Sequence, residues 1–249
     1  MAARIMTTAK SQMITACAAV LCSSPIPAQV PLPPPNWVLQ RARDTYVELK
    51  SYADSGTILE EYGTSSKDTH TFATYFIRAP RYFLLKFNKQ GGDQYVIWGD
   101  PDAFHTWWKS TAQQTDYPNP QNIPAISQSD YNTKGAALKI PTLLYGKSEL
   151  AARMLAISDP GETGLEDIGG NSCYRLTGRA SDTYAATGKE MNVRRLTMWI
   201  DVSTYLVRQV REEWDATPGQ RHRTTTIYQP QANPSLNDSR FKFVPPAAR

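Results

Sequence analysis

The stretch that decides the fold is residues 190–228, which reads EMNVRRLTMWID (190–201), VSTYLVRQVREEW (202–214) and RHRTTTIY (221–228). β-Branched and aromatic residues fill these three runs, as is typical of strands. Turn-forming residues separate the runs, at 201–204 and at 216–220, where Pro218-Gly219 lies. We therefore expect an antiparallel meander in the middle of a larger curved sheet.

The composition favours one β-rich domain. The chain has 249 residues, of which 41% are hydrophobic, and its 18 Pro and 14 Gly suit many short strands and turns better than long helices. The formal charge is +4, and the Lys and Arg residues are scattered. Because no basic stripe with interleaved aromatic residues is present, the sequence argues against nucleic acid as a partner.

The N-terminus predicts export to the periplasm. Residues 1–28 contain Arg4 and Lys10, then a short apolar run and small residues that suit cleavage after Ala28, which together indicate a signal peptide. The apolar run is shorter than the ~20 residues of a transmembrane helix, and no later run approaches that length.

Lipid anchoring at Cys17 is the alternative use of this leader, because residues 14–17 resemble a lipoprotein cleavage box. We do not favour it, since most of the apolar run follows Cys17 and would not be removed. Without the leader only Cys173 remains, so the mature chain forms no intramolecular disulfide.

The mature chain is predicted to begin with a proline-rich linker, 29–35, followed by one domain, 36–249. A helix should start with Asn36 as its N-cap and bury the residues that recur at helical spacing, which are Leu39, Ala42, Tyr46 and Leu49. Strands are expected at 51–62, 72–78, 81–88, 94–98, 103–109 and 161–179, with a polar turn at 63–69 and polar loops at 110–129 and 179–189.

Residues 81–88 are apolar on both faces, unlike a strand with one face in water. We expect a helix to cover one face of this strand and the other face to line a cavity. Residues 123–156 contain short apolar pieces broken at Pro141 and Gly146, and they are predicted to form a helical lid. Within it, residues 138–155 should cover the concave face through Leu143, Leu144, Met154 and Leu155.

Several landmarks, in order along the chain, resemble the periplasmic outer-membrane lipoprotein carrier (LolA-like) superfamily. They are Leu49-Lys50 at the end of the first helix, Arg78-Ala79-Pro80-Arg81-Tyr82-Phe83, Gly99-Asp100 through Trp107-Trp108, Trp199-Ile200-Asp201 with Leu206-Val207-Arg208, and Phe241, Phe243, Pro245 and Pro246. The resemblance covers almost the whole mature chain. It implies an incomplete β-barrel with an apolar concave face, helices that act as a lid, and acyl chains between them.

One departure from the carrier pattern concerns the lid. The carriers have Arg directly before the Pro, where this chain has Ala79, with Arg78 and Arg81 nearby. A shift of one residue reverses the direction of a side chain in a strand, so the carrier's opening mechanism does not transfer directly. We therefore identify the chain as a divergent relative of the superfamily and not as the dedicated carrier.

The fold class that follows is mainly β (α+β): a curved antiparallel sheet forming an incomplete β-barrel, with an N-terminal helix and a helical lid. We expect a periplasmic carrier for a lipid or an acylated protein. Arg78 and Arg81 are candidates for a lid latch. The residues assigned to the apolar cavity and lid are Phe76, Phe83, Leu85, Phe87, Trp98, Trp107, Leu143, Leu144 and Met198.

Two other functions remain open at this point. An incomplete barrel leaves strand edges that can pair with a partner strand, so an envelope sensor or interaction module is the first alternative. A hydrolase using Asp100, Asp102 or His105 is less favoured, because the chain has no nucleophile, phosphate-loop or dinucleotide motif. No pair of histidines has zinc-like spacing, so we expect no catalytic residues, metal or cofactor, and His70 is interpreted as part of a solvated turn.

Overall fold

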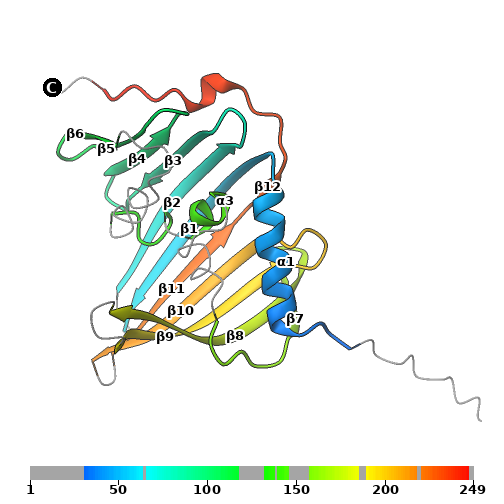
Figure 1. Cartoon of the computed structure of the whole chain (residues 1–249). Helices are drawn as coiled ribbons and strands as arrows, with labels where there is room; N and C mark the ends of the chain where they lie inside the picture. The colour runs from blue at the N-terminus through cyan, green and yellow to red at the C-terminus, as the bar shows by residue number, and fades with distance from the viewer. Residues whose placement is uncertain are drawn as a thin grey trace, which may run out of the picture. The chain divides into compact units, whose positions relative to one another are not determined.

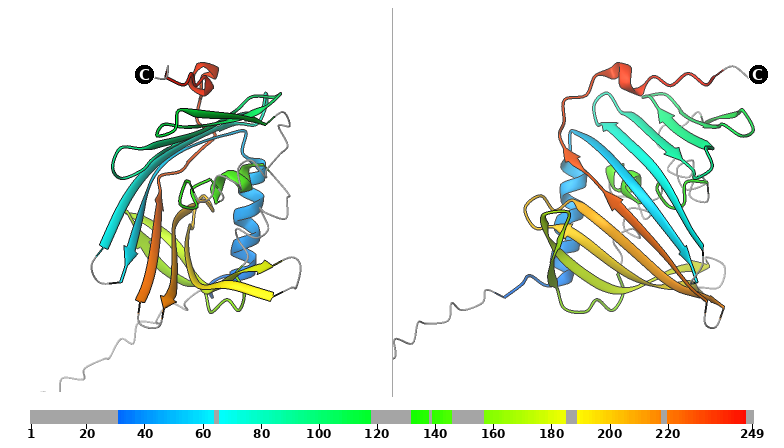
Figure 2. Two further views of the ribbon diagram at one scale, coloured as in Figure 1. Left: turned by 90° about the vertical axis from the view of Figure 1, so that its left-hand side faces the viewer. Right: turned by 180° about the vertical axis from the view of Figure 1, so that it is seen from behind.

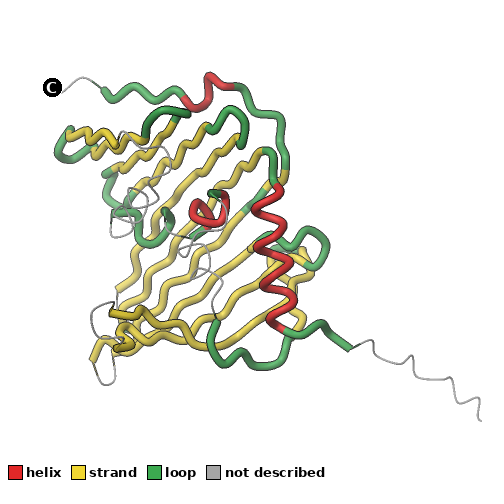
Figure 3. Tube along the Cα trace, viewed as in Figure 1, coloured by secondary structure: helices red, strands yellow, loops and turns green. Residues whose placement is uncertain are grey.

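The fold is a large antiparallel sheet with helices on one face and the C-terminal segment on the other (Figures 1 and 3). The structure is a computed structural model that describes residues 31–63, 66–117, 132–137, 139–145, 157–184, 189–217 and 220–246. Its elements are α1 (Pro35–Glu48), β1 (Ser51–Tyr62), β2 (Ser66–Ile77), β3 (Tyr82–Asn88), β4 (Gln94–Gly99), β5 (Phe104–Trp108), β6 (Gln113–Tyr117), α3 (Ile140–Leu144), β7 (Gly164–Ile168), β8 (Asn171–Tyr184), β9 (Lys189–Asp201), β10 (Val207–Thr217), β11 (Gln220–Tyr228), β12 (Gln231–Ala232) and the 3-10 helix η1 (Asp238–Phe241).

The sheet is open. Its strand order is β6-β5-β4-β3-β2-β1-β11-β10-β9-β8-β7, and β12 pairs with β1 off this path. Strands β6 and β7 form the two edges and do not pair with each other, while the sheet curves around α1 and α3 (Figure 2). The predicted class, an incomplete barrel with a helix and a helical insertion, is therefore confirmed. None of the helices within the described ranges is long and apolar enough to cross a membrane.

The predicted meander is confirmed as β9, β10 and β11, which pair in sequence order. The turn after β9 is closed by Asp201, whose Oδ1 accepts hydrogen bonds from the backbone amides of Ser203 and Thr204, each at 2.9 Å. Its Oδ2 is bound by two guanidinium nitrogens of Arg208, at 3.0 and 2.8 Å. Burial opposes ionisation here, but these donors outweigh it and lower the pKa of Asp201 to about 2.

Helix α1 packs in the curve of the sheet, and the four residues expected to face the core, Leu39, Ala42, Tyr46 and Leu49, are buried. The predicted start of the helix is wrong by two residues: Pro35 is the first helical residue and Pro34 occupies the N-cap, in place of Asn36. A proline at the first helical position is favourable because its ring already holds a helical φ and the missing N–H would have no helical partner.

The convex face of β3 is covered by the C-terminal segment. Phe241 is buried there and stacks on Tyr82, while Phe243 contacts Trp98 and Trp107 at ring distances of 5.0 and 5.5 Å. This explains why both faces of β3 are apolar, since the helices cover the concave side and this segment covers the other. The expectation that one face of β3 lines a cavity therefore does not hold on the convex side.

Three predicted loops are partly strand. Strand β2 already starts at Ser66, within the expected turn 63–69, because it pairs with β1 over the whole length of both strands. Strand β6 lies within the expected loop 110–129, and its polar sequence fits an edge strand that water reaches. Strands β8 and β9 extend into the expected loop 179–189, since β8 ends at Tyr184 and β9 begins at Lys189. In each case pairing with a neighbouring strand stabilises a segment whose own preference for strand is weak.

Candidate functional site

The concave face of β2–β5 is a wall of aromatic and aliphatic side chains. Cross-strand pairing places Phe76 opposite Phe83, Phe72 opposite Phe87, and Leu85 opposite Ile97. Because side chains alternate between the faces of a strand, every second residue of each strand points to this side. The described side chains of the wall belong to one buried cluster that includes residues of α1 and α3.

Helix α3 and the residue after it cover this wall. Leu143 and Leu144 are 2% and 0% exposed. The Tyr145 ring lies edge-on to three phenylalanine rings, those of Phe76 (5.5 Å), Phe83 (5.8 Å) and Phe104 (5.5 Å). The predicted cover over the concave face is thus present at residues 140–145, while Met154 and Leu155 lie outside the described residues.

The hydroxyl of Tyr145 is buried and has no hydrogen-bond partner within the described chain. Burial raises the pKa of this phenol well above its usual value, so the group is neutral. A buried hydroxyl without a partner costs about 1–3 kcal/mol. The contact between the cover and the wall therefore contains one unfavourable polar atom among otherwise apolar groups.

An ion triad, in which Lys139 is buried and Glu212 and Arg194 are partly exposed, ties the cover to the other half of the sheet. The Lys139 amine lies 2.8 Å from Glu212 Oε2, and Arg194 Nε lies 2.8 Å from Glu212 Oε1. Burial alone would raise the pKa of Glu212, but the two cations outweigh it and lower the value to about 2. Glu212 is on β10 and points to the concave face, in line with Val210, so it holds residues 139–145 over the sheet.

A second ion pair lies closer to the aromatic wall. Lys134 Nζ is 3.2 Å from Glu60 Oε2, which also lies 3.0 Å from His70 Nε2. The Gln90 backbone amide donates to His70 Nδ1 at 3.0 Å, so Nδ1 is unprotonated and Nε2–H donates to Glu60. The interpretation of His70 as solvated is wrong: it is 1% exposed, because β2 begins earlier than expected and places it on the concave face.

Glu60, Asp68 and His70 are also close enough to bind a metal ion together, with ligand atoms within 4.8 Å of one another. The position beside Glu60 is already taken by the Lys134 ammonium, and His70 uses both ring nitrogens in hydrogen bonds. Burial opposes the ionisation of Glu60, but hydrogen bonds from His70 and Tyr62 and the charge of Lys134 lower its pKa. The cluster therefore ties residues 132–137, just before the cover, to the sheet.

A third polar group lies beneath α1. The Val207 amide donates to Tyr46 Oη at 3.0 Å, and Tyr52 Oη donates to Asp54 Oδ2 at 3.1 Å. The Gln229 amide donates to Asp54 Oδ1 at 2.8 Å. Asp54 is 4% exposed, and this burial raises its pKa to about 7 despite the hydrogen bonds. The pKa values of Glu212 and Asp54, both on the concave side, thus move in opposite directions, since Glu212 has two cations beside it and Asp54 forms no ion pair within the described part of the chain.

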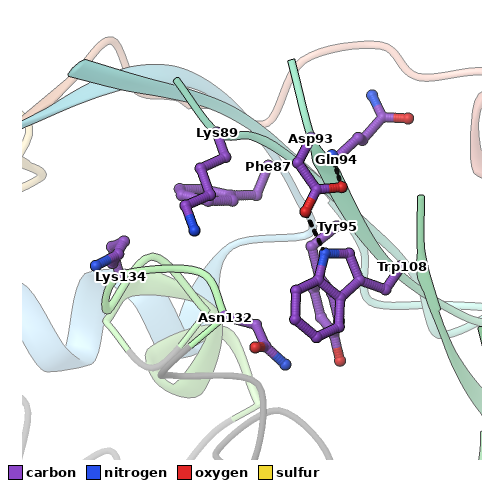
Figure 4. A pocket seen from close by; sticks show the side chains of 8 residues that line it. All are labelled: Phe87, Lys89, Asp93, Gln94, Tyr95, Trp108, Asn132 and Lys134. Carbon is purple, nitrogen blue, oxygen red and sulfur yellow. Dashed lines mark hydrogen bonds between the residues drawn. The ribbon is translucent and has the colours of Figure 1, made fainter. Parts of the chain in front are cut away.

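A pocket of about 190 Å³ opens beside the aromatic wall, between the β3–β4 turn and the segment that carries Lys134 (Figure 4). The Asp93 carboxylate accepts hydrogen bonds from the Trp108 indole N–H and from the backbone amides of Gln94 and Ser110. Phe87 and Tyr95 belong to the buried cluster as well, so the pocket adjoins the apolar core. Its lining residues are Phe87, Lys89, Asp93, Gln94, Tyr95, Trp108, Asn132 and Lys134.

The structure brings together most of the residues that the sequence predicts for the cavity and lid. The residues that meet in the concave cluster are Phe76, Phe83, Leu85, Phe87, Leu143, Leu144 and Met198. Trp98 and Trp107 lie on the convex face instead, in contact with Phe243. Arg78 donates to the backbone carbonyls of Leu49 (2.7 Å) and Tyr46 (3.1 Å) at the end of α1, and its guanidinium lies 5.2 Å from the centre of the Phe76 ring, while Arg81 is exposed.

The residues considered for hydrolysis take part in turns and edge contacts. Asp100 Oδ1 accepts the amides of Asp102 and Ala103, both at 2.9 Å, and closes the turn before β5. His105 Nδ1 lies 2.8 Å from Asp116 Oδ1 on the edge strand. Cys173 is fully buried, and burial raises the pKa of its thiol to about 11, which keeps it unreactive as a nucleophile.

No family model matches the chain, and no curated protein matches it. Among solved structures, it is similar to the Mycobacterium tuberculosis lipoprotein LppX, with 12% identity, a TM-score of 0.45, and coverage of 81% of this chain and 98% of that chain. It is similar to a chain of the Pseudomonas aeruginosa MucA/MucB complex (12% identity, TM-score 0.44, 84% and 61% covered) and to a LolA superfamily protein from Nitrosomonas europaea (9%, 0.34, 85% and 99%). The similarity concerns the fold, and the ligand has to be argued from this chain's own residues.

Proposed function

We propose that this chain is a periplasmic binding or carrier protein for an apolar ligand, such as a lipid or the acyl chain of an acylated protein. The ligand would lie between the aromatic wall of β2–β5 and the cover formed by residues 139–145. The observation that carries this proposal is the position of the Tyr145 ring against the aromatic wall. Three phenylalanine rings of the wall are covered there by Tyr145, whose hydroxyl is buried without a hydrogen-bond partner among the described residues.

The geometry corresponds to a closed state. The pocket beside the wall measures about 190 Å³, below the ~300 Å³ at which ligand pockets for small molecules usually begin. A ligand must therefore move the cover away from the wall. The cover is a five-residue helix, too short to be stable alone, so its position depends on its contacts with the sheet. Those contacts include the Lys139–Glu212 ion pair, and the Lys134–Glu60 pair holds the segment just before the cover.

The energies involved allow such an exchange. Burying each methylene of an acyl chain contributes about 0.8 kcal/mol, so ten contribute about 8 kcal/mol. Against this, lifting Leu143 and Leu144 from the wall costs about 1.5–3 kcal/mol each if they become exposed. A chain of ten or more carbons therefore offsets the loss of these contacts, whereas a short one does not. Specificity for chain length follows from this competition.

The test is binding of a fluorescent fatty-acyl probe to Leu144→Asp, with Val244→Asp as the matched control. Leu144 is fully buried at the cover, whereas Val244 is 83% exposed. We expect Leu144→Asp to keep the far-UV circular dichroism of the sheet and to bind the probe at least about tenfold more weakly, since it places a charge in the apolar contact. A folded variant with affinity within twofold of wild type would contradict the proposal, and so would unfolding of the entire sheet.

A second candidate function is protein interaction through the open edges of the sheet. Strand β7 is an edge strand on which Leu165 is 54% exposed, and such an edge can accept a strand from a partner. Native mass spectrometry of gently purified protein separates the two functions. Co-purified lipid supports the carrier, whereas a clean mass together with specific capture of an envelope protein supports the interaction module.

A further inference from the structure

The convex face carries a row of charged residues across six strands, near the end of the sheet where β8 and β10 finish and β9 and β11 begin. Cross-strand pairing places them side by side, with side chains on the face opposite to Met198 and Glu212. In order from β8 to β2 they are Arg179, Arg195, Glu213, Arg223, Glu61 and Lys67.

The row alternates in sign except at its β8–β9 end. Arg223 bridges Glu213 (3.1 Å) and Glu61 (3.3 Å), and Lys67 binds Glu61 at 3.0 Å. Arg195 stands directly opposite Arg179, whose own acidic partner, the exposed Asp159, lies 3.9 Å away, and Glu213 on the other side of Arg195 already pairs with Arg223. Like charges directly opposite each other in a sheet are destabilising. Among the described residues, Arg195 takes part in no ion pair, so positive charge accumulates here.

A pocket of about 300 Å³ lies at this end of the row. Arg221, on β11, joins it opposite Asp215, and like Arg195 it has no ion pair within the described residues. Val193 lies at the same place and is 43% exposed. Four arginines and two acids line the pocket, but Arg194 is paired with Glu212 and Arg179 lies 3.9 Å from Asp159. Glu213 is paired with Arg223, so Arg195 and Arg221 are the arginines of the lining without an ion pair among the described residues. The complete lining is Arg179, Val193, Arg194, Arg195, Glu213, Trp214, Asp215 and Arg221.

We propose that this pocket, the convex arginine pocket, binds a phosphate group. Guanidinium groups present planar sets of N–H donors that match phosphate oxygens in pairs, so Arg195 and Arg221 suit a phosphate better than a spherical anion. A bound dianion would remove the repulsion between Arg179 and Arg195. The phosphate belongs either to a membrane phospholipid headgroup or to a soluble molecule, and the exposed Val193 beside the arginines is compatible with the apolar part of a lipid. The site lies on the opposite face of the sheet from the aromatic wall, so it is independent of the acyl-binding proposal.

The experiment measures binding of inorganic phosphate to the full chain by isothermal titration calorimetry at low ionic strength. The variants are Arg195→Gln and Arg221→Gln. The matched control is Arg175→Gln, which removes the same charge from the same face outside the pocket, where Arg175 lies 3.6 Å from Glu166. We expect saturable binding to wild type and to the control, and about tenfold weaker binding to each pocket variant.

Thermal unfolding gives a second measurement, and general electrostatic attraction of phosphate to the protein does not account for its expected result. Without phosphate, Arg195→Gln should unfold at a higher temperature than wild type, because it removes the repulsion with Arg179. At the same concentration, phosphate should raise the unfolding temperature of wild type more than that of the variant. Equal losses of phosphate binding in Arg175→Gln and Arg195→Gln would overturn the proposal.

Vesicle flotation distinguishes the sources of the phosphate. One arm uses phosphatidylcholine with phosphatidylglycerol, and the other uses phosphatidylcholine alone. Flotation with the anionic vesicles that Arg195→Gln abolishes and Arg175→Gln retains assigns the pocket to a lipid headgroup. Phosphate binding without flotation assigns it to a soluble phosphate compound. Absence of both in wild type overturns the site. Unchanged acyl-probe binding in Arg195→Gln is expected, because the two sites are separate.

Discussion

Replacing Glu212 by Gln should destabilise the protein strongly at neutral pH and hardly at all in strong acid. Burial raises the pKa of Glu212, but Lys139 and Arg194 outweigh it and bring the value from 4.5 to about 2. One pKa unit corresponds to about 1.4 kcal/mol, so the ionised carboxylate stabilises the fold by about 3 kcal/mol. Because the folded-state pKa is the lower one, this stabilisation is complete above pH 4.5 and is lost as the pH falls through about 2.

Denaturant unfolding of wild type and Glu212→Gln across this pH range measures the effect. The free energy of unfolding should differ by about 3 kcal/mol at pH 7, and the difference should approach zero near pH 2. Glu213→Gln is the matched control, because Glu213 is the next residue, on the opposite face, and its partner Arg223 is 38% exposed. A pair of that kind contributes about 0–1 kcal/mol. A difference for Glu212→Gln below 1 kcal/mol at pH 7, or one that stays constant down to pH 3, would refute the reasoning.

Three further substitutions test other parts of the structure. Burial raises the pKa of Asp54 from 3.8 to about 7, so the wild-type protein loses stability as the pH rises through this window. Relative to wild type, Asp54→Asn should therefore gain about 4 kcal/mol of unfolding free energy between pH 4 and pH 8. A difference between the two proteins that stays constant over this range would contradict the burial of Asp54. Tyr145→Phe removes a hydroxyl without a partner and should stabilise the protein by about 1 kcal/mol in denaturant unfolding; a loss of similar size would mean that the hydroxyl is bonded. Phe241→Ala should cost about 3 kcal/mol and shift the tryptophan emission to longer wavelength as water reaches Trp98; unchanged emission would show that the C-terminal segment stays in place.

Much of the architecture could be predicted from local patterns. The meander, the N-terminal helix and the cover at 140–145 follow from alternation, helical spacing and turn residues, which act over a few positions. The Gly169-Gly170 turn is another example, because both residues have positive φ, which glycine adopts without strain. The strands missed by the sequence, such as β6, form through pairing with a neighbour and carry little signal of their own.

The face on which a residue lies was harder to predict. Phe83 and Trp98 both belong to strongly apolar strands, yet cross-strand pairing places Phe83 on the concave side, while Trp98 is opposite Leu84 on the convex side. In a strand that is apolar on both faces, alternation does not reveal which face meets which cover. The missing information was the position of the C-terminal segment, whose Phe243 contacts Trp98.

The sequence does contain a signal for the acids that face the concave side. Glu212 falls in line with Val210 and Trp214 at every second residue, and Glu60 falls in line with Ile58 in the same way. A carboxylate in an inward-facing row needs a cation or a hydrogen-bond donor, since an unpaired buried charge is strongly unfavourable. The sequence could therefore indicate that partners exist. It could not identify Lys139 and Lys134, because those lie far away in sequence and reach the acids only when the cover folds over the sheet.

The same contacts explain how a closed cover and a binding function can coexist. In the proposed carrier, the side chains that would hold a ligand, such as Phe76 and Phe83, contact Tyr145 in this structure, so the cover and the ligand would compete for one surface. The unpartnered hydroxyl weakens the cover's hold, while the pairs Lys134–Glu60 and Lys139–Glu212 strengthen it. If only apolar contacts closed this surface, they would favour the cover and the ligand alike, and the balance between the two would not depend on pH. A cover held also by carboxylates whose pKa values are depressed closes less firmly as these groups are protonated, so ligand binding through the same opening should strengthen towards low pH.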